Sequence, residues 1–233
     1  MLKNFLVFLS LFFLSVNVFA EQANFFSCKG SYDTNKAKEI MDKVQKKYLN
    51  IQTIHSTFIQ SSYLAAVDTS EGSSGEVWLA KPDKMKWQYL VPEEQMFLMN
   101  GNTLWYYQPL DQQVLIQNFE EVVLTDLPVA FLLGMGDLRR DFTLLSACKA
   151  EKGVVLKLKP AVKNEKKEEL EGFGLLIDPD LDFPIGAEII HVGGNRTAIL
   201  LENIKLQEKI NDTIFAPEFP KGIDINDMRN SRR

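Results

Sequence analysis

The sequence contains few of the side chains that enzymes use for catalysis. Its histidines are His55 and His191, and its cysteines are Cys28 and Cys148, each pair being widely separated in the chain. It has no G-x-S-x-G nucleophile motif, no H-E-x-x-H zinc motif and no phosphate-binding P-loop. We therefore expect no catalytic residues, no cofactor and no metal site.

Positive charge is also scarce. The chain has 26 lysines and arginines against 31 aspartates and glutamates, which gives a net charge of −5. Contacts to phosphate require clustered Lys and Arg side chains, so we expect no nucleic-acid partner. For the same reason we expect only weak attraction to an anionic membrane surface.

The N-terminus has the features of a secretory signal peptide. Lys3 is followed by an almost entirely apolar run at 5–16, and Ala20 supplies a small residue for cleavage. This run is shorter than the roughly 20 residues that cross a bilayer as a helix. We expect residues 1–20 to be removed and residues 21–233 to form a single exported domain. The alternative is an uncleaved membrane anchor.

Two cysteines in an exported protein indicate a disulfide. Oxidising compartments favour pairing, so Cys28 and Cys148 are expected to form one bond. Such a bond would attach the N-terminal extension to the body of the protein. The alternative is two buried free thiols.

One helix is predicted near the N-terminus. Asp33, Thr34 or Asn35 can cap it. An apolar stripe with helical spacing then follows, made of Ala37, Ile40, Met41, Val44 and Tyr48. This stripe must pack on another apolar surface.

From Ile54 onward the apolar period changes to two, which is typical of strands. Gly72–Gly75 is interpreted as a turn between strands at 54–63 and 76–80, and Asn100-Gly101 as a hairpin turn. Further strands are predicted at 84–91, 96–99, 103–108, 113–117, 154–158, 173–177, 185–192 and 197–206. Their close spacing favours an antiparallel meander.

Residues 125–134 interrupt this series of strands. Pro128 sits in the first turn of a predicted short helix that is apolar on nearly every side. Large apolar side chains gather in the neighbouring strands, among them Met85, Trp87, Tyr89, Met96, Leu98, Leu104 and Tyr106. Such a set fits either an ordinary filled core or the lining of a cavity for an apolar ligand.

Several motifs occur in a specific order along the chain. They are the run 75–89, Pro92 to Gln95, Asn100-Gly101, the run 104–107, Gln113-Val114, Pro128, the run 132–134 and the closing segment 211–224. As a set they resemble the LolA family of outer-membrane lipoprotein carriers. The resemblance extends over nearly all of the chain after residue 20.

The resemblance implies a mainly β fold of the α+β type: an incomplete antiparallel β-barrel with short lid helices over a hydrophobic cavity. It implies a carrier, not an enzyme, which takes triacylated lipoproteins from an inner-membrane ABC release complex to an outer-membrane acceptor. We expect it to act as a monomer. The residues expected to bind acyl chains are Met85, Trp87, Tyr89, Leu98, Leu104, Val129, Ala130 and Leu133.

Lys81 departs from the family pattern. The family usually has an arginine there, which bonds to the backbone of the lid. Lysine lacks the planar fork of arginine, so Lys81 is expected to keep a lid contact with fewer hydrogen bonds. The alternative is a solvated lysine at the end of a strand.

Two other functions remain compatible with the sequence. Regulatory proteins with this half-barrel sense acyl chains or mislocalised lipoproteins, but they usually carry a further C-terminal domain. A carrier of free lipid is the other alternative.

Overall fold

The computed structural model describes residues 25–119, 137–161 and 170–229. The predicted signal peptide and the predicted helix at 125–134 lie outside these residues. Within these three ranges, every helix is too short or too polar to cross a membrane.

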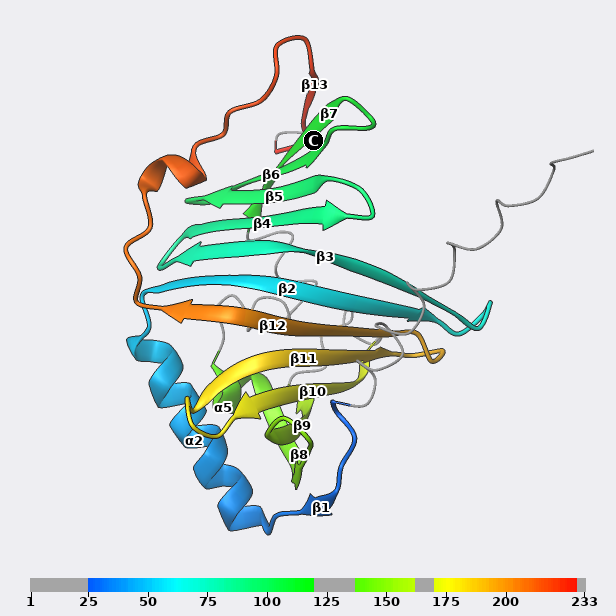
Figure 1. The fold of residues 1–233 in the computed structure, drawn as a ribbon, viewed down its shortest axis with the longest axis vertical. Coiled ribbons are helices and arrows are strands. Elements are labelled where there is room, and N and C mark those ends of the chain that lie inside the picture. Colours follow the sequence, from blue (N-terminus) through cyan, green and yellow to red (C-terminus); the bar gives the residue numbers. More distant parts are fainter. Residues whose placement is uncertain (1–24, 120–136, 162–169, 230–233) are drawn as a thin grey trace, which may run out of the picture.

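Thirteen strands in the described part of the chain form one open sheet (Figure 1). The sheet order is β1-β8-β9-β10-β11-β12-β2-β3-β4-β5-β6-β7-β13, and β1 and β13 end it without pairing to each other. Neighbours are antiparallel except β13, which pairs in parallel with β7. This confirms the expected mainly β fold with an incomplete barrel.

The strand bounds are β1 Gly30–Ser31, β2 Thr53–Leu64, β3 Thr69–Ala80, β4 Lys84–Val91, β5 Gln95–Asn100, β6 Thr103–Gln108, β7 Gln113–Asn118, β8 Phe142–Lys149, β9 Val154–Pro160, β10 Leu170–Asp178, β11 Phe183–His191, β12 Arg196–Leu206 and β13 Asp224–Asp227. The described residues also contain helix α2 Thr34–Asn50, helix α5 Leu138–Asp141 and the 3-10 turn η1 Asp212–Phe215. The predicted strands and the predicted N-terminal helix are therefore confirmed with small shifts at their ends, except that β3 begins at Thr69, well before the predicted strand at 76–80.

The turn predicted at Gly72–Gly75 is wrong. These residues lie inside β3, which pairs with β2 over its whole length from Thr69 to Ala80. The turn instead precedes β3, where Asp68 adopts a positive φ of 49°. Aspartate tolerates this conformation better than most residues, so a glycine was not required to reverse the chain.

Helix α2 covers one face of the sheet, which we call the inner face. Asp33 caps the helix, since its carboxylate accepts hydrogen bonds from the backbone N–H groups of Asn35 and Lys36. The predicted stripe is mostly buried, and the Tyr48 ring stacks on Phe183 of β11 with 5.3 Å between ring centroids. The side chains of α2 thus join inner-face residues of both halves of the sheet in one core cluster.

The N-terminal segment covers part of the opposite face, which we call the outer face. Phe25 and Phe26 are buried there in a second cluster with apolar side chains of β9, β10 and β12. Phe26 lies over Gly174 and Gly186, where a Cβ atom would be 3.4 Å from its ring. The two glycines leave room for the phenyl ring close to the sheet.

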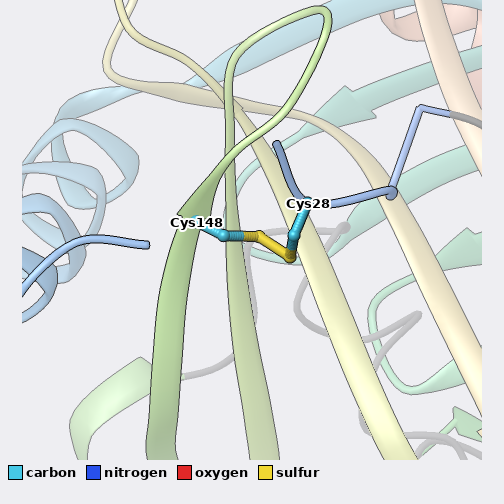
Figure 2. The surroundings of a disulfide bond; sticks show 2 residues. All are labelled: Cys28 and Cys148. Atoms are coloured by element: carbon cyan, nitrogen blue, oxygen red, sulfur yellow. A yellow bond between two sulfur atoms is a disulfide. The ribbon is translucent and has the colours of Figure 1, made fainter. Parts of the chain in front are cut away.

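A disulfide between Cys28 and Cys148 holds this segment in place (Figure 2). It is the bond that the pair of cysteines indicated, and it links residues 120 positions apart in sequence. Directly after Cys28, Lys29 N donates to Lys149 O at 2.7 Å, and β1 pairs with β8. The covalent bond and the short strand together attach the N-terminal segment to one edge of the sheet.

A C-terminal arm, residues 207–229, contacts the outer side of the other half of the sheet. Asp212 accepts from Lys84 at 3.0 Å, the Phe215 carbonyl accepts from Asn100 at 3.3 Å, and Phe219 packs on Tyr107. Phe215 is fully buried. The arm ends in β13, which adds a parallel strand to β7.

Removing the disulfide should destabilise the protein by about 2–4 kcal/mol, because the bond restricts a long loop of the unfolded chain. The double variant Cys28→Ser and Cys148→Ser should show this loss in urea unfolding followed by circular dichroism. Wild-type protein in reductant should behave like the variant, whereas the variant should not respond to reductant. Equal stability of oxidised wild type and variant would contradict this expectation.

Gly75→Ala should cost about 1–3 kcal/mol of unfolding free energy, the usual penalty of overpacking. A Cβ at this position would lie 1.9 Å from the backbone oxygen of Gln88, so β3 and β4 would have to separate. Gly172→Ala is the matched control, since its Cβ would meet nothing closer than 3.7 Å. Equal stability of the two variants in urea unfolding would rule out the close approach at Gly75.

Candidate functional site

The inner face of β2, β4, β5 and β6 carries a continuous series of aromatic side chains. Pairing aligns Trp87 of β4 with Phe97 of β5 and Phe97 with Tyr106 of β6, so the three lie side by side. Phe97 and Tyr106 stack with 4.3 Å between centroids and 4° between their planes. We call Phe58, Trp87, Tyr89, Phe97 and Tyr106 the aromatic row.

The row becomes more accessible at one end. Phe58 and Trp87 are buried, with Trp87 5% exposed, while Tyr89, Phe97 and Tyr106 are partly exposed. Phe58 contacts the rings of both Trp87 and Tyr89, at centroid distances of 4.6 and 5.1 Å. The buried rings of Phe58 and Trp87 therefore pack beneath aromatic rings that remain partly accessible.

A second set of apolar side chains runs beside the aromatic row. Met85, Met99 and Leu104 pair across β4, β5 and β6 and are all buried on the inner face. Thioether side chains are flexible and polarisable, which lets them pack against irregular apolar shapes. We call these three residues the aliphatic row.

Polar groups lie at the outer end of this surface. The Tyr89 hydroxyl donates to Gln60 Oε1 at 3.0 Å, and the Tyr106 hydroxyl donates to Gln95 Oε1 at 2.7 Å. Burial, together with the nearby negative charge of Asp111, raises the pKa of Tyr106. The Tyr106 phenol is therefore neutral at physiological pH and presents no phenolate charge to an apolar ligand.

Four of the predicted lining residues share the inner face: Met85, Trp87, Tyr89 and Leu104. Leu98 is a correction. It pairs with Lys86 and Trp105, its side chain lies on the outer face, and it is fully buried there. Val129, Ala130 and Leu133 lie outside the described residues, so their role stays a prediction.

Sequence reasoning missed Phe58, Phe97 and Met99. Residues 96–99 are all apolar, so a period of two does not show which of them face inward. The predicted hairpin could have shown which of these residues face inward. In a hairpin with a two-residue loop, each even-numbered residue of one strand pairs with an odd-numbered residue of the other, and paired side chains point to the same face. Leu104 therefore shares a face with Phe97 and Met99, whereas Leu98 points to the opposite face.

Lys81 lies in the turn after β3 and contacts the end of α2. Its Nζ donates to the Tyr48 carbonyl and lies 4.9 Å from the centroid of the Tyr48 ring. Carbonyls in the last turn of a helix lack intrahelical partners and favour a positive charge. Lys81 is therefore not a freely solvated lysine, and its predicted contact with the lid lies beyond the residues that the structure describes.

His55 lies away from this surface. It stacks on Trp78 at 5.0 Å on the outer side of β2 and β3, where its Nε2 is 3.3 Å from a Glu76 carboxylate oxygen. These contacts are those of a structural histidine at a strand surface.

A known protein family matches most of this chain. The model of the family described as outer membrane lipoprotein carrier protein LolA matches residues 49–218. The chain belongs to this family. The match contains both rows of the inner face and Lys81.

Two curated relatives named outer-membrane lipoprotein carrier protein agree with this assignment. The protein of Azotobacter vinelandii is 29% identical over 180 residues, which is 75% of this chain and 81% of the relative. The protein of Vibrio cholerae is 26% identical over 157 residues, 67% of this chain and 74% of the relative. The resemblance inferred from the ordered motifs is thus confirmed.

A solved structure shares the fold. An uncharacterised conserved protein from Thermus thermophilus superposes with a TM-score of 0.54 at 15% identity, covering 82% of this chain and 99% of the other. At this identity the likeness concerns the arrangement of strands and helices alone.

The burial of Lys81 should make stability depend on pH. Desolvation lowers the pKa of Lys81 below 10.5, so just below pH 10.5 the unfolded chain binds more protons than the folded one. Stability from this group should therefore rise with pH in that window. The unfolding free energy of wild type relative to Lys81→Met should increase between pH 8 and pH 10 in urea titrations. A difference that falls or stays constant would contradict this.

Proposed function

We propose that this protein is a periplasmic carrier of triacylated lipoproteins, which holds their acyl chains against the inner face of the half-barrel. The observation that carries the proposal is the joint presence of the family match and an inner face lined by the aromatic and aliphatic rows. The names of the curated relatives support the same cargo. Carriage needs no catalytic step, and we propose that the protein is not an enzyme.

The physical need for such a carrier follows from the cost of hydrating acyl chains. Each methylene group moved from water into apolar surroundings contributes about 0.8 kcal/mol. A lipoprotein with several chains therefore does not leave a membrane for water at a useful rate. An apolar surface that replaces lipid contacts removes most of that penalty during transfer.

Release of cargo requires that the binding be adjustable. Met85 and Met99 adapt to chains of differing shape, and Tyr89, Phe97 and Tyr106 keep part of their rings accessible. We propose that the predicted helix with Val129, Ala130 and Leu133 acts as a lid over this surface. Lys81, bonded to the end of α2, would then connect the lid with the helix that covers the inner face.

The remaining steps are proposed from the family resemblance. The chain would be exported, and its signal peptide would be cleaved after Ala20. Residues 21–233 would then form one domain that acts as a monomer. It would receive cargo from an inner-membrane ABC release complex. It would deliver this cargo to an outer-membrane acceptor.

Trp87→Glu should fold but fail to release lipoprotein from spheroplasts into the soluble fraction. The substitution places a carboxylate among the apolar side chains of the inner face, where it cannot coexist with bound acyl chains. The assay measures newly matured lipoprotein that appears in the medium in a one-to-one complex with added carrier. A loss of at least about tenfold is expected, since one unpaired buried charge costs more than 1.4 kcal/mol.

Leu90→Glu is the matched control. It introduces the same carboxylate side chain on the same strand, but Leu90 is 49% exposed. Wild type and Leu90→Glu should release lipoprotein equally. Release by folded Trp87→Glu at the wild-type level would remove the inner face as the binding surface, and no release by wild type would overturn the carrier function itself.

A further inference from the structure

Trp87 carries a hydrogen-bond donor that the protein leaves unused. Its indole Nε1 is the one buried side-chain nitrogen or oxygen without a hydrogen-bond partner in the described ranges 25–119, 137–161 and 170–229. The residue is 5% exposed, so bulk water does not satisfy the group. Native proteins pair nearly all buried polar groups, and an exception of this kind calls for an explanation.

The side chains that flank Trp87 are apolar and offer no hydrogen-bond acceptor. Val77 and Phe97 flank it on the adjacent strands, and the Phe58 ring lies 4.6 Å away. Two hydroxyl groups lie on the same face, those of Ser56 and Tyr89, and neither accepts a hydrogen bond from the indole. The Ser56 hydroxyl donates to a backbone oxygen, that of Thr57 or that of Glu202, and the Tyr89 hydroxyl donates to Gln60.

The position of Trp87 along β4 indicates what kind of acceptor it could meet. Toward the start of the strand, Met85 is buried in the aliphatic row. Toward its end, Tyr89 bonds to a glutamine and Val91 is 52% exposed. Trp87 thus lies at the boundary between wholly apolar and partly polar surroundings. An acyl chain has the same boundary at the ester carbonyl, where its hydrocarbon tail joins the polar head.

We propose that the Trp87 indole N–H donates a hydrogen bond to an ester carbonyl oxygen of the bound acyl chain. This inference rests on the proposed carrier function and adds a determinant of specificity to it. Indole is a donor only, so the ligand must supply the acceptor, and a hydrocarbon tail has none. The bond fixes the depth at which a chain sits: its ester lies at Trp87 and its tail extends along the aliphatic row.

The test compares two synthetic lipopeptides that differ only in the linkage of their chains, one with esters and one with ethers. Binding to the purified protein is measured by titration calorimetry. Wild type should bind the ester form about three- to tenfold more tightly, the range expected for one buried hydrogen bond. Trp87→Phe keeps an aromatic ring but removes the donor, and should bind both forms with equal affinity.

Trp78→Phe is the matched control, because it removes an indole from the outer side of the sheet. It should keep the wild-type preference for the ester. A second readout needs no comparison of affinities. The infrared carbonyl stretch of an isotope-labelled ester should move to lower frequency on binding wild type, and should not do so on binding Trp87→Phe.

The outcomes separate this inference from the proposed function. If wild type binds ester and ether forms equally and the carbonyl stretch does not move, the hydrogen bond is refuted while the carrier function stands. If wild type binds neither lipopeptide, both are refuted. If Trp87→Phe fails to fold, the ester preference of wild type and its infrared shift still decide.

Discussion

Each strand of an open sheet presents side chains to two faces, and over much of this sheet both faces carry apolar side chains that must be shielded from water. Helix α2 covers part of the inner face, and its Tyr48 stacks on Phe183. The outer face is covered by the two ends of the described chain, with Phe26 at one end and Phe215 at the other. Because the terminal segments cover the outer face, the inner face of β4, β5 and β6 keeps the apolar surface that we propose binds acyl chains.

The proposed binding surface combines rigidity with tolerance. Its aromatic rings hold one another in place, as the stacked pair Phe97 and Tyr106 shows, and its methionines adapt in shape. Hydrophobic attraction has no direction, so it can hold a chain at many depths. A single directional donor at Trp87 would select one of them. Lys81 adds a link between the turn after β3 and the end of α2.

Much of this fold could be predicted from the sequence, because alternation and helical spacing are local patterns. The stripe from Ala37 to Tyr48 gave α2, and the even number of cysteines gave the disulfide. Leu98 was misplaced because four consecutive apolar residues hide the alternation. The cover of the outer face by Phe26 and the contact of Lys81 with Tyr48 are long-range, and no spacing in the sequence encodes them.

The strands that end the sheet have a consequence for the behaviour of many copies in one compartment. A long, flat edge strand offers unpaired backbone groups on which another chain can add, which leads to aggregation. Here β1 has two residues, and the four residues of β13 are all exposed and include two aspartates. The four exposed residues of β13, two of them aspartates, make the β7 edge a poor template for strand addition, whereas β1 covers only Cys148 and Lys149 of β8. The C-terminal arm thereby shields one end of the sheet that carries the proposed apolar binding surface from pairing with other copies of the chain.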